Sequence, residues 1–563
     1  MPHDLYHRGM YSNLPRLALL ALLSILAIAL ASCGGDEDTE EESGDLGPDP
    51  VAMVPADAPF YTEIVVRPEG SLGEDLNSAL SKLLSEEDPG ARVREAIDQE
   101  LADDPDSAGI TYTDDIEPWL GSRMGVFVSG YDAETEEADA AAAIAITDAE
   151  AAQAFVDKAA EAGDETLTDE TYEDVDYKTD GDDTAVGIDG DFLLIGNPAG
   201  FEAAVDAGAG DSLADNEEAA AALAEAPDNS LFSLYADTSA IVDLIKSSGD
   251  LDQTELDQID QVVGQFGDGP IEAWGTVTDS SFAIGGSGPT GEGSSGPSEL
   301  LSGFPADSWL AFASADLGEQ LQTGIEQFES SFEAGFSSNL PPGVAAEINP
   351  FDQVEQETGV DLAKDLAWIG DVGGFVQGTS IFGLGGGLVL EATDEAAASD
   401  ALGKLQTALE DSRELRGQVQ IGPSSSGEGF TIQPTGGVPV GAEVVLQDGN
   451  VVAAIGANGV DDVLSPEETL EGSDRFTTAS EALTDGATPT FFLDFAPIVA
   501  LIEGSGQATA DPDYQLAKPY IDALDYVISG SAVEGDRSTG SIVLGVKEAE
   551  ASGEDVAAAT ITP

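Results

Sequence analysis

The sequence predicts an α+β fold with two tandem domains, each an antiparallel sheet covered on one side by helices. Two observations lead to this prediction. An internal repeat has an offset near 250 residues, and short apolar runs alternate with amphipathic helical segments in each half. Asp189-Gly190 and Asp448-Gly449 each stand between two apolar runs. Asp-Gly at such a place is typical of a tight hairpin, because both central turn positions favour positive φ, so antiparallel pairing follows.

The repeat appears at five places in the same order. The first is Pro55-Ala56-Asp57, which returns as Pro305-Ala306-Asp307. The other four are Gly109 to Gly121 with Gly359 to Gly370, Thr147-Asp148 with Thr393-Asp394, Ile188 to Asp191 with Gln447 to Asn450, and Asp237 to Ile245 with Asp494 to Ile502. Collinear matches of this kind indicate a duplication.

Helices are expected between the strands. One helical face joins Leu76, Leu80 and Leu83 in the first half. Its counterpart in the second half joins Leu321, Ile325, Phe328 and Phe332. Thr147 to Glu150 has the spacing of a capping box, whereas the second copy has Ala396 in place of the acid. Trp119 and Trp368 occupy matched positions and are expected to be core anchors, each indole N–H with one partner.

The only cysteine, Cys33, follows the apolar stretch Leu17 to Ala31. This stretch is shorter than the roughly 20 residues that span a bilayer, and Arg8 and Arg16 precede it. The pattern resembles a bacterial lipoprotein signal ending in a lipobox. It implies cleavage before Cys33, diacylglycerol on the cysteine sulfur, and a protein tethered outside the cytoplasmic membrane.

The expected organisation has six parts. They are a cleaved signal peptide at 1–32, the lipidated cysteine with a disordered acidic linker at 33–50, a first α+β repeat at 51–294, a Gly/Ser/Pro-rich connection at 295–302, a second repeat at 303–548 and a tail at 549–563.

The chain is strongly acidic, with 18 Lys and Arg against 110 Asp and Glu. Removal of residues 1–32 takes away Asp4, Arg8 and Arg16 and leaves 16 basic and 109 acidic residues, a net charge of −93. Binding to phosphate backbones needs basic side chains, so nucleic acid is excluded as a partner. The charge attracts cations, and a saline habitat would explain it equally well.

The residues that the exported chain lacks exclude several classes of catalytic site. The two histidines, His3 and His7, lie in the signal peptide, so the exported chain has no imidazole. Histidine-dependent nucleophilic sites, ordinary zinc sites and haem ligation are thereby excluded. Phosphate-binding and dinucleotide-binding glycine motifs are absent as well. We therefore expect no catalytic residues, no metal site and no cofactor.

Two kinds of carboxylate chemistry stay open. A glycosidase needs two carboxyl groups at a set separation, which a sequence does not display. Asp176, Asp180, Asp182 and Asp183 crowd one loop, but their spacing differs from a calcium-binding loop and Gly187 stands at the twelfth position. Weak association with divalent cations is expected there rather than a dedicated site.

Several motifs resemble one known family. They are Pro55 to Tyr61, Val66 to Gly70, and Ile116 to Gly121 followed by Gly125 to Val128. The similarity is to a large family of bacterial proteins catalogued as a domain of unknown function, DUF3352, and it covers most of the exported chain. The resemblance implies an exported, duplicated domain and brings no reaction, ligand or site residue with it.

We therefore expect a non-catalytic, membrane-anchored lipoprotein that serves as a two-domain scaffold or binding module. One alternative is a carrier of a lipid or other apolar ligand. A dry cavity lined by Phe328, Phe332, Phe375 and Phe382 would favour it, and tight packing would count against it. A second alternative is a carboxylate-dependent polysaccharide hydrolase, against which the 6% aromatic content argues.

Overall fold

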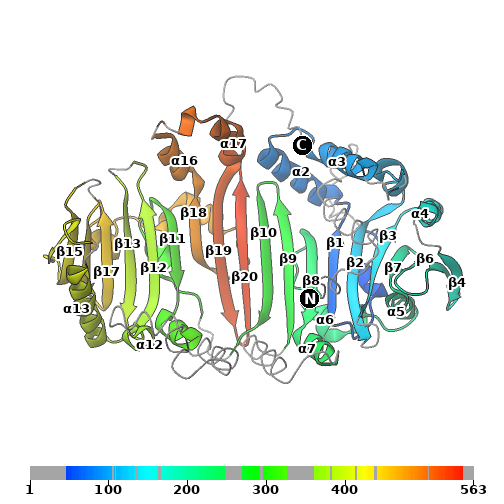
Figure 1. Ribbon diagram of the computed structural model, residues 1–563, viewed down its shortest axis with the longest axis horizontal. Helices are drawn as coiled ribbons and strands as arrows, with labels where there is room; N and C mark the ends of the chain where they lie inside the picture. Colours follow the sequence, from blue (N-terminus) through cyan, green and yellow to red (C-terminus); the bar gives the residue numbers. More distant parts are fainter. Residues whose placement is uncertain are drawn as a thin grey trace, which may run out of the picture. The chain divides into compact units, whose positions relative to one another are not determined.

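The computed structural model describes residues 46–548 except 104–106, 108, 133–136, 163–166, 248–268, 292–295, 326–360, 381–382, 413–414, 437–439, 505 and 507. The chain forms two compact units. Unit 1 comprises Met1–Glu292, Gly535–Thr539 and Val546–Pro563, and unit 2 comprises Gly293–Glu534 and Gly540–Gly545. Each unit is an antiparallel sheet with helices, which confirms the predicted α+β class (Figure 1).

Among its described residues, unit 1 has ten strands. They are β1 (Phe60–Val65), β2 (Leu120–Asp132), β3 (Glu137–Ile146), β4 (Thr168–Tyr172), β5 (Val175–Thr179), β6 (Ala185–Asp189), β7 (Phe192–Gly196), β8 (Ser230–Asp237), β9 (Pro270–Thr278) and β10 (Ser281–Pro289). Its helices are η1 (Pro50–Met53), α2 (Gly70–Leu84), α3 (Pro89–Asp103), η3 (Tyr112–Ile116), α4 (Ala149–Ala162), α5 (Pro198–Ala209), η4 (Leu213–Asp215), α6 (Glu217–Leu223) and α7 (Thr238–Ser247).

Unit 2 repeats this succession. Its strands are β11 (Ser308–Ser314), β12 (Ile369–Gln377), β13 (Gly385–Ala392), β14 (Val419–Pro423), β15 (Glu428–Pro434), β16 (Ala442–Gln447), β17 (Asn450–Gly456), β18 (Thr488–Asp494) and β19 (Leu524–Glu534). Its helices are η5 (Leu300–Gly303), α12 (Leu362–Asp365), α13 (Glu395–Asp411), α14 (Val460–Leu464), η7 (Leu470–Gly472), α15 (Asp474–Ser480), α16 (Phe495–Gly504), η8 (Ala508–Ala510) and α17 (Pro512–Ala523). The last strand, β20 (Arg537–Val546), contributes residues to both units.

The two units have the same strand order. In unit 1 it is β10-β9-β8-β1-β2-β3-β7-β6-β5-β4, and every pair is antiparallel. In unit 2 it is β19-β18-β11-β12-β13-β17-β16-β15-β14, again antiparallel throughout. Isolated bridges join Pro55 to Ser212 and Pro305 to Thr469 at matching places.

The two predicted hairpins differ in detail. Asp448 and Gly449 both have positive φ, 51° and 77°, between the paired residues Gln447 and Asn450. In unit 1 the pairing of Asp189 with Phe192 leaves Gly190 and Asp191 as the turn, and only Gly190 has positive φ. The prediction of positive φ at both turn residues is therefore confirmed for the second hairpin. In the first hairpin the turn lies one residue later than predicted, and only one of its two residues has positive φ.

Helices cover both faces of the unit 1 sheet, so the prediction of helices on one side is wrong. Leu194 belongs to a cluster with Phe201 and Val205 of α5, whereas the neighbouring Leu193 belongs to a cluster with Val156 of α4. Successive strand residues point to opposite faces, so the two clusters lie on opposite sides. The sequence did not reveal the second helical layer, because a strand that is buried on both faces, such as Phe192 to Ile195, is apolar throughout and lacks the alternation of apolar and polar residues.

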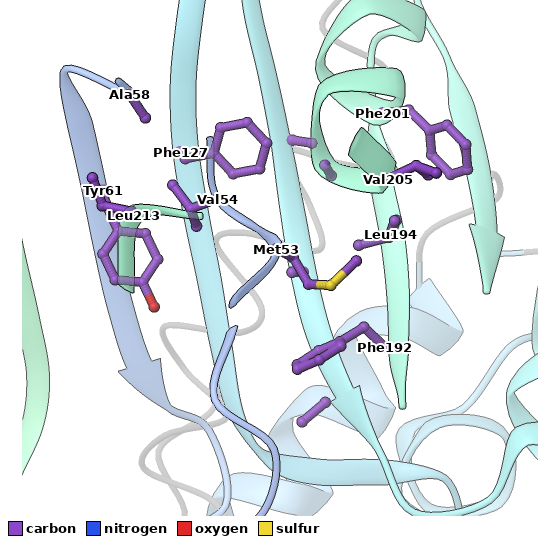
Figure 2. Close-up of a cluster of buried hydrophobic side chains, with 14 of the residues drawn as sticks. Met53, Val54, Ala58, Tyr61, Phe127, Phe192, Leu194, Phe201, Val205 and Leu213 are labelled. Carbon is purple, nitrogen blue, oxygen red and sulfur yellow. The ribbon is translucent and has the colours of Figure 1, made fainter. Parts of the chain in front are cut away.

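The first of these clusters surrounds Tyr61 and Phe127 (Figure 2). Met53 and Val54 come from the segment of η1, and Leu213 begins η4. We call the sheet face beneath this cluster face A. Its packing places η1, η4 and α6 over the middle strands of unit 1, where the polar side chains described below lie.

Three local expectations can be compared with the structure. Leu76 and Leu80 are buried, as the helical face predicts, while Leu83 is partly exposed. The cap of α4 is Asp148, whose carboxylate accepts hydrogen bonds from Glu150 N and Ala151 N, so the predicted role of Thr147 is wrong. Its repeat partner Asp394 accepts the same two bonds, which explains why helix α13 begins without an acid at Ala396.

The segment around residue 300, predicted as a connection, is folded. Leu301 of η5 is fully buried, and η5 packs against β11, β12 and β18. In the described ranges no helix combines the length and apolarity that crossing a bilayer requires.

Candidate functional site

Four polar side chains lie in a row across face A of unit 1. Tyr61 of β1 pairs with Tyr235 of β8, Tyr235 pairs with Glu272 of β9, and Glu272 pairs with Ser287 of β10. Directly paired residues point to the same face of a sheet. We call these four residues the polar row. Their exposed fractions are 0%, 3%, 3% and 5% in that order, so the whole row is removed from water.

One arginine closes the Ser287 end of the polar row. Arg537 Nη2 contacts the Glu272 carboxylate and donates to Ser287 Oγ at 2.9 Å. Arg537 Nη1 donates to Pro270 O at 3.4 Å, and a second acid, Glu225, lies 3.8 Å from Nη2. Two carboxylates therefore share a single guanidinium, and the second oxygen of Glu272, Oε1, is buried without a hydrogen-bond partner among the described residues.

This environment perturbs two acid groups. Burial raises the pKa of Glu272 to about 7, with Arg537 lowering it and Glu225 raising it further. Burial likewise raises the pKa of Tyr235 to about 12, helped by the negative charges of Asp237, Glu218 and Glu272. Glu272 therefore changes protonation near neutral pH, far from the ordinary range of a carboxyl group.

A second arginine lies on face A near the other end of the row. Arg123 Nη1 is 2.9 Å from Asp49 and 3.2 Å from Glu63, and Tyr61 Oη donates to Glu63 at 3.3 Å. Burial raises the pKa of both Tyr61 and Glu63. Each arginine on this face is thus paired with two acids, and one of each pair is largely buried.

A glycine makes room for this arrangement. A Cβ on Gly125, which pairs with Glu63, would lie 2.7 Å from Pro50 Cβ and 2.8 Å from the Tyr61 ring. The Tyr61 side chain therefore occupies the space above β2 that any other residue would fill.

Unit 2 has apolar residues at the equivalent places. Ala311 pairs with Phe375 as Tyr61 pairs with Phe127, and Ala311 pairs with Phe492 as Tyr61 pairs with Tyr235. Phe492 in turn pairs with Ile528, which is fully buried and stands where unit 1 has Glu272. The same fold is therefore built with Ala, Phe and Ile in this row, and the polar residues of unit 1 are not needed to form it.

Other polar contacts are the same in both units and serve the fold. Lys158 Nζ lies 2.5 Å from Asp115, and Lys404 Nζ lies 2.9 Å from Asp365. Both aspartates also accept a backbone N–H, from Thr111 and from Asp361. Because they recur at matched positions, these contacts fix the loop ahead of each tryptophan.

Trp119 and Trp368 are buried, as predicted for core anchors. Trp119 Nε1 donates to Asp115 O at 2.7 Å. Trp368 Nε1 is buried without a partner among the described residues, so the expectation of one partner fails there.

The polar row was not predicted from the sequence. The repeat already aligns Tyr61 with Ala311 and Tyr235 with Phe492, and comparison of the two copies would have found half of it.

The other predicted residues are placed as follows. Cys33, Phe328, Phe332 and Phe382 lie outside the described residues. Phe375 is 3% exposed and packs against the Phe304 ring at 5.2 Å. The carboxylate of Asp180 accepts three backbone N–H groups of its own loop, from Asp182, Asp183 and Thr184. Within the described ranges, acids, histidines and cysteines nowhere gather in a group of three suited to a metal ion.

Comparison with known proteins adds a family. The model of "Protein of unknown function (DUF3352)" matches residues 17–531. The chain belongs to the DUF3352 family. No curated protein shows significant similarity to it. Among solved structures, crystal forms I, IV and III of TP0453 match 44%, 43% and 44% of this chain and 81%, 80% and 82% of theirs, at 11%, 13% and 12% identity. The TM-score is 0.23 for each of the three.

Proposed function

We propose that this DUF3352 protein is an exported lipoprotein, anchored through diacylglycerol on Cys33 to the outer face of the cell membrane, and that it acts as a non-catalytic binding protein. In this proposal unit 1 binds and unit 2 is a structural scaffold. The observation that supports the division is the polar row, which is present in one unit and replaced by Ala311, Phe492 and Ile528 in the other.

The physical reason is the cost of burying polar groups. A buried ion pair is often no more stabilising than apolar side chains of similar volume, and unit 2 shows that such side chains fit this fold. The free energy of unfolding of unit 1 is therefore lowered, or raised only slightly, by the polar side chains Tyr235, Glu272 and Arg537. Residues kept at a cost are candidates for a role other than folding.

The absence of imidazole from the chain after Cys33 supports a non-catalytic role. Glu272 has the raised pKa that a general acid needs, but it is 3% exposed and in contact with Arg537. A polysaccharide chain would have to displace that contact before reaching the carboxyl group. A ligand of the polar row would have to displace the same contact, but binding, unlike hydrolysis, needs no second catalytic group beside Glu272.

The anchor is tested by metabolic labelling with an alkyne fatty acid. The chain should carry the label and sediment with membranes, and Cys33→Ser should lose the label. Protease added to intact cells should digest the protein. An unlabelled chain that resists the protease would refute the proposed anchor and location.

Binding is tested by native mass spectrometry of the full chain purified gently from its host. The matched control converts two residues of the row to their unit 2 counterparts, Tyr235→Phe and Glu272→Ile, and removes the facing charge with Arg537→Leu. We expect an added mass on the wild type that the control lacks. A wild-type chain with no added mass, or the same mass on both proteins, would refute binding at the polar row.

A further inference from the structure

Two rows of uncharged side chains cross one face of the unit 2 sheet. Directly paired residues point to the same face, and so do residues two apart on a strand. The first row follows the pairings of Phe430, Val444, Ala453, Leu388, Gly374, Phe312 and Phe491. The second row follows those of Ile432, Ala442, Ile455, Gly386, Val376, Leu310 and Leu493. We call the surface formed by these two rows the apolar face.

Helix α13 covers one end of the apolar face. Phe430 is fully buried and clusters with Ala398 and Leu402 of α13, which packs on β14, β15 and β16. Beyond these strands the rows reach water, because Phe312 of the first row is 38% exposed and Ile455 of the second row is 39% exposed. Contiguous apolar surface that is open to water indicates an interaction site, whereas scattered single residues do not.

The exposed side chains of the apolar face are larger than the fold requires. Phe312 and Leu388 flank β12 as Thr62 and Ala142 flank β2 in unit 1, so the same sheet forms with smaller residues there. The Phe312 ring lies against the sheet, since a Cβ on Gly374 would be 2.9 Å from it. The apolar face therefore presents a fixed aromatic ring beside an enlarged aliphatic side chain.

The charge of the chain limits what this face can bind. A net charge of −92 makes two copies repel each other, and it repels anionic lipid headgroups in the same way. A basic peptide would find no carboxylate in either row to pair with its side chains. An uncharged apolar molecule meets none of these obstacles. The carrier expected as an alternative from the sequence would hold this class of molecule, but its predicted lining residue Phe375 lies on the other face.

We propose that unit 2 binds an uncharged apolar molecule on the apolar face, in contact with Phe312, Leu388 and Ile455. Strands lie about 4.8 Å apart, so the stretch from β18 to β17 is roughly 19 Å wide, enough for an extended hydrocarbon chain. This inference goes beyond the binding proposed for unit 1. The scaffold role proposed for unit 2 rests on Ala311 and Phe492, which point to the other face, so each proposal is tested independently of the other.

Fluorescence titration of the full chain with N-phenyl-1-naphthylamine, an uncharged apolar probe, tests the proposal. The wild type should bind the probe saturably. Phe312→Thr with Leu388→Ala, which installs the unit 1 residues, should weaken binding about tenfold, because it removes much of the apolar contact area. Leu405→Thr, which removes an exposed apolar side chain of α13 outside both rows, is the matched control and should bind as the wild type does.

A second probe tests the argument from charge. 1-Anilinonaphthalene-8-sulfonate has similar rings and a permanent negative charge. Its binding should strengthen about tenfold from low to high salt, since salt screens the repulsion from the acidic chain, whereas binding of the uncharged probe should change far less. Equal salt dependence of the two probes would show that charge does not select the ligand, and the proposal of an uncharged molecule would be wrong.

Three results would overturn binding at the apolar face. They are a wild type that does not bind the uncharged probe saturably, equal binding by the variant with Phe312→Thr and Leu388→Ala, and sedimentation showing a wild-type dimer that this variant loses. The last result would assign the face to a second copy. If the double variant does not fold, Ile455→Gln serves instead, because it leaves β11 and β13 unchanged and should also weaken binding. The control variant of the polar row should bind the probe as the wild type does, which separates this test from that of unit 1.

Discussion

Replacing Glu272 by Gln should change the pH dependence of unit 1 stability. The folded-state pKa of about 7 lies above the ordinary 4.5, so the folded protein binds this proton more tightly than the unfolded chain. The stabilisation is present at low pH and is lost as the pH rises through 7. The rise of the pKa from 4.5 to about 7 corresponds to about 3 kcal/mol in total. Most of this stabilisation, roughly 2 to 3 kcal/mol, is lost between pH 5 and pH 8.

The assay is urea unfolding monitored by tryptophan fluorescence. Trp309→Phe and Trp368→Phe in the background leave Trp119 and Trp274, which are both buried in unit 1. Between pH 5 and pH 8 the free energy of unfolding of the wild-type background should fall by roughly 2 to 3 kcal/mol more than that of the Glu272→Gln variant. Comparing the two proteins cancels the titration of the other acids.

Glu217→Gln is the control, because this acid is exposed on α6. Its loss of stability should match that of the wild-type background. Equal pH dependence in the wild type and Glu272→Gln would show that burial does not hold a proton on Glu272, and it would refute the reasoning about the polar row.

Three further perturbations follow from the same contacts. Ile528→Glu, which places an acid in the fully buried unit 2 position without an arginine opposite, should cost more than about 3 kcal/mol in urea unfolding of unit 2. Gly125→Ala, whose Cβ meets the Tyr61 ring, should cost about 1–3 kcal/mol, and no loss would mean that β2 shifts freely. Burial raises the pKa of Asp115, but hydrogen bonds, first from Lys158, hold it below its ordinary value. The ionised Asp115 therefore stabilises the fold above about pH 4, and this contribution is lost as the pH falls below 4. Lys158→Met should remove less than about 1 kcal/mol of it, because Lys158 is 40% exposed and the ion pair is screened by water. Acid titration followed by circular dichroism measures this change, and an unaltered acid midpoint would contradict it.

Much of the fold was predictable because it depends on local signals. Asp448-Gly449 specifies its turn through positive φ at both residues, and Leu76 and Leu80 mark a buried helix face. The placement of helices on both faces of unit 1 was missed. A doubly buried run such as Phe192 to Ile195 has the same composition whichever helices cover it, so the second layer left no periodic trace.

The candidate site was less predictable than the fold. Among 109 acidic residues after Cys33, nothing in the sequence distinguishes Glu272 from its solvated neighbours. Its character comes from burial beside Tyr235 and from Arg537, which is 265 residues away in the chain. Only the alignment of the two copies indicates this site, because it places the polar Tyr235 opposite the apolar Phe492.

The sequence by itself determined the acidity, the absence of histidine after Cys33, the family and the repeated order of strands and helices, because each of these depends on composition or on residues close together in the chain. The tertiary structure decided which acid loses its water and which arginine faces it. A pKa near neutrality requires burial and charges brought together by the sheet register, and neither is a property of a linear chain.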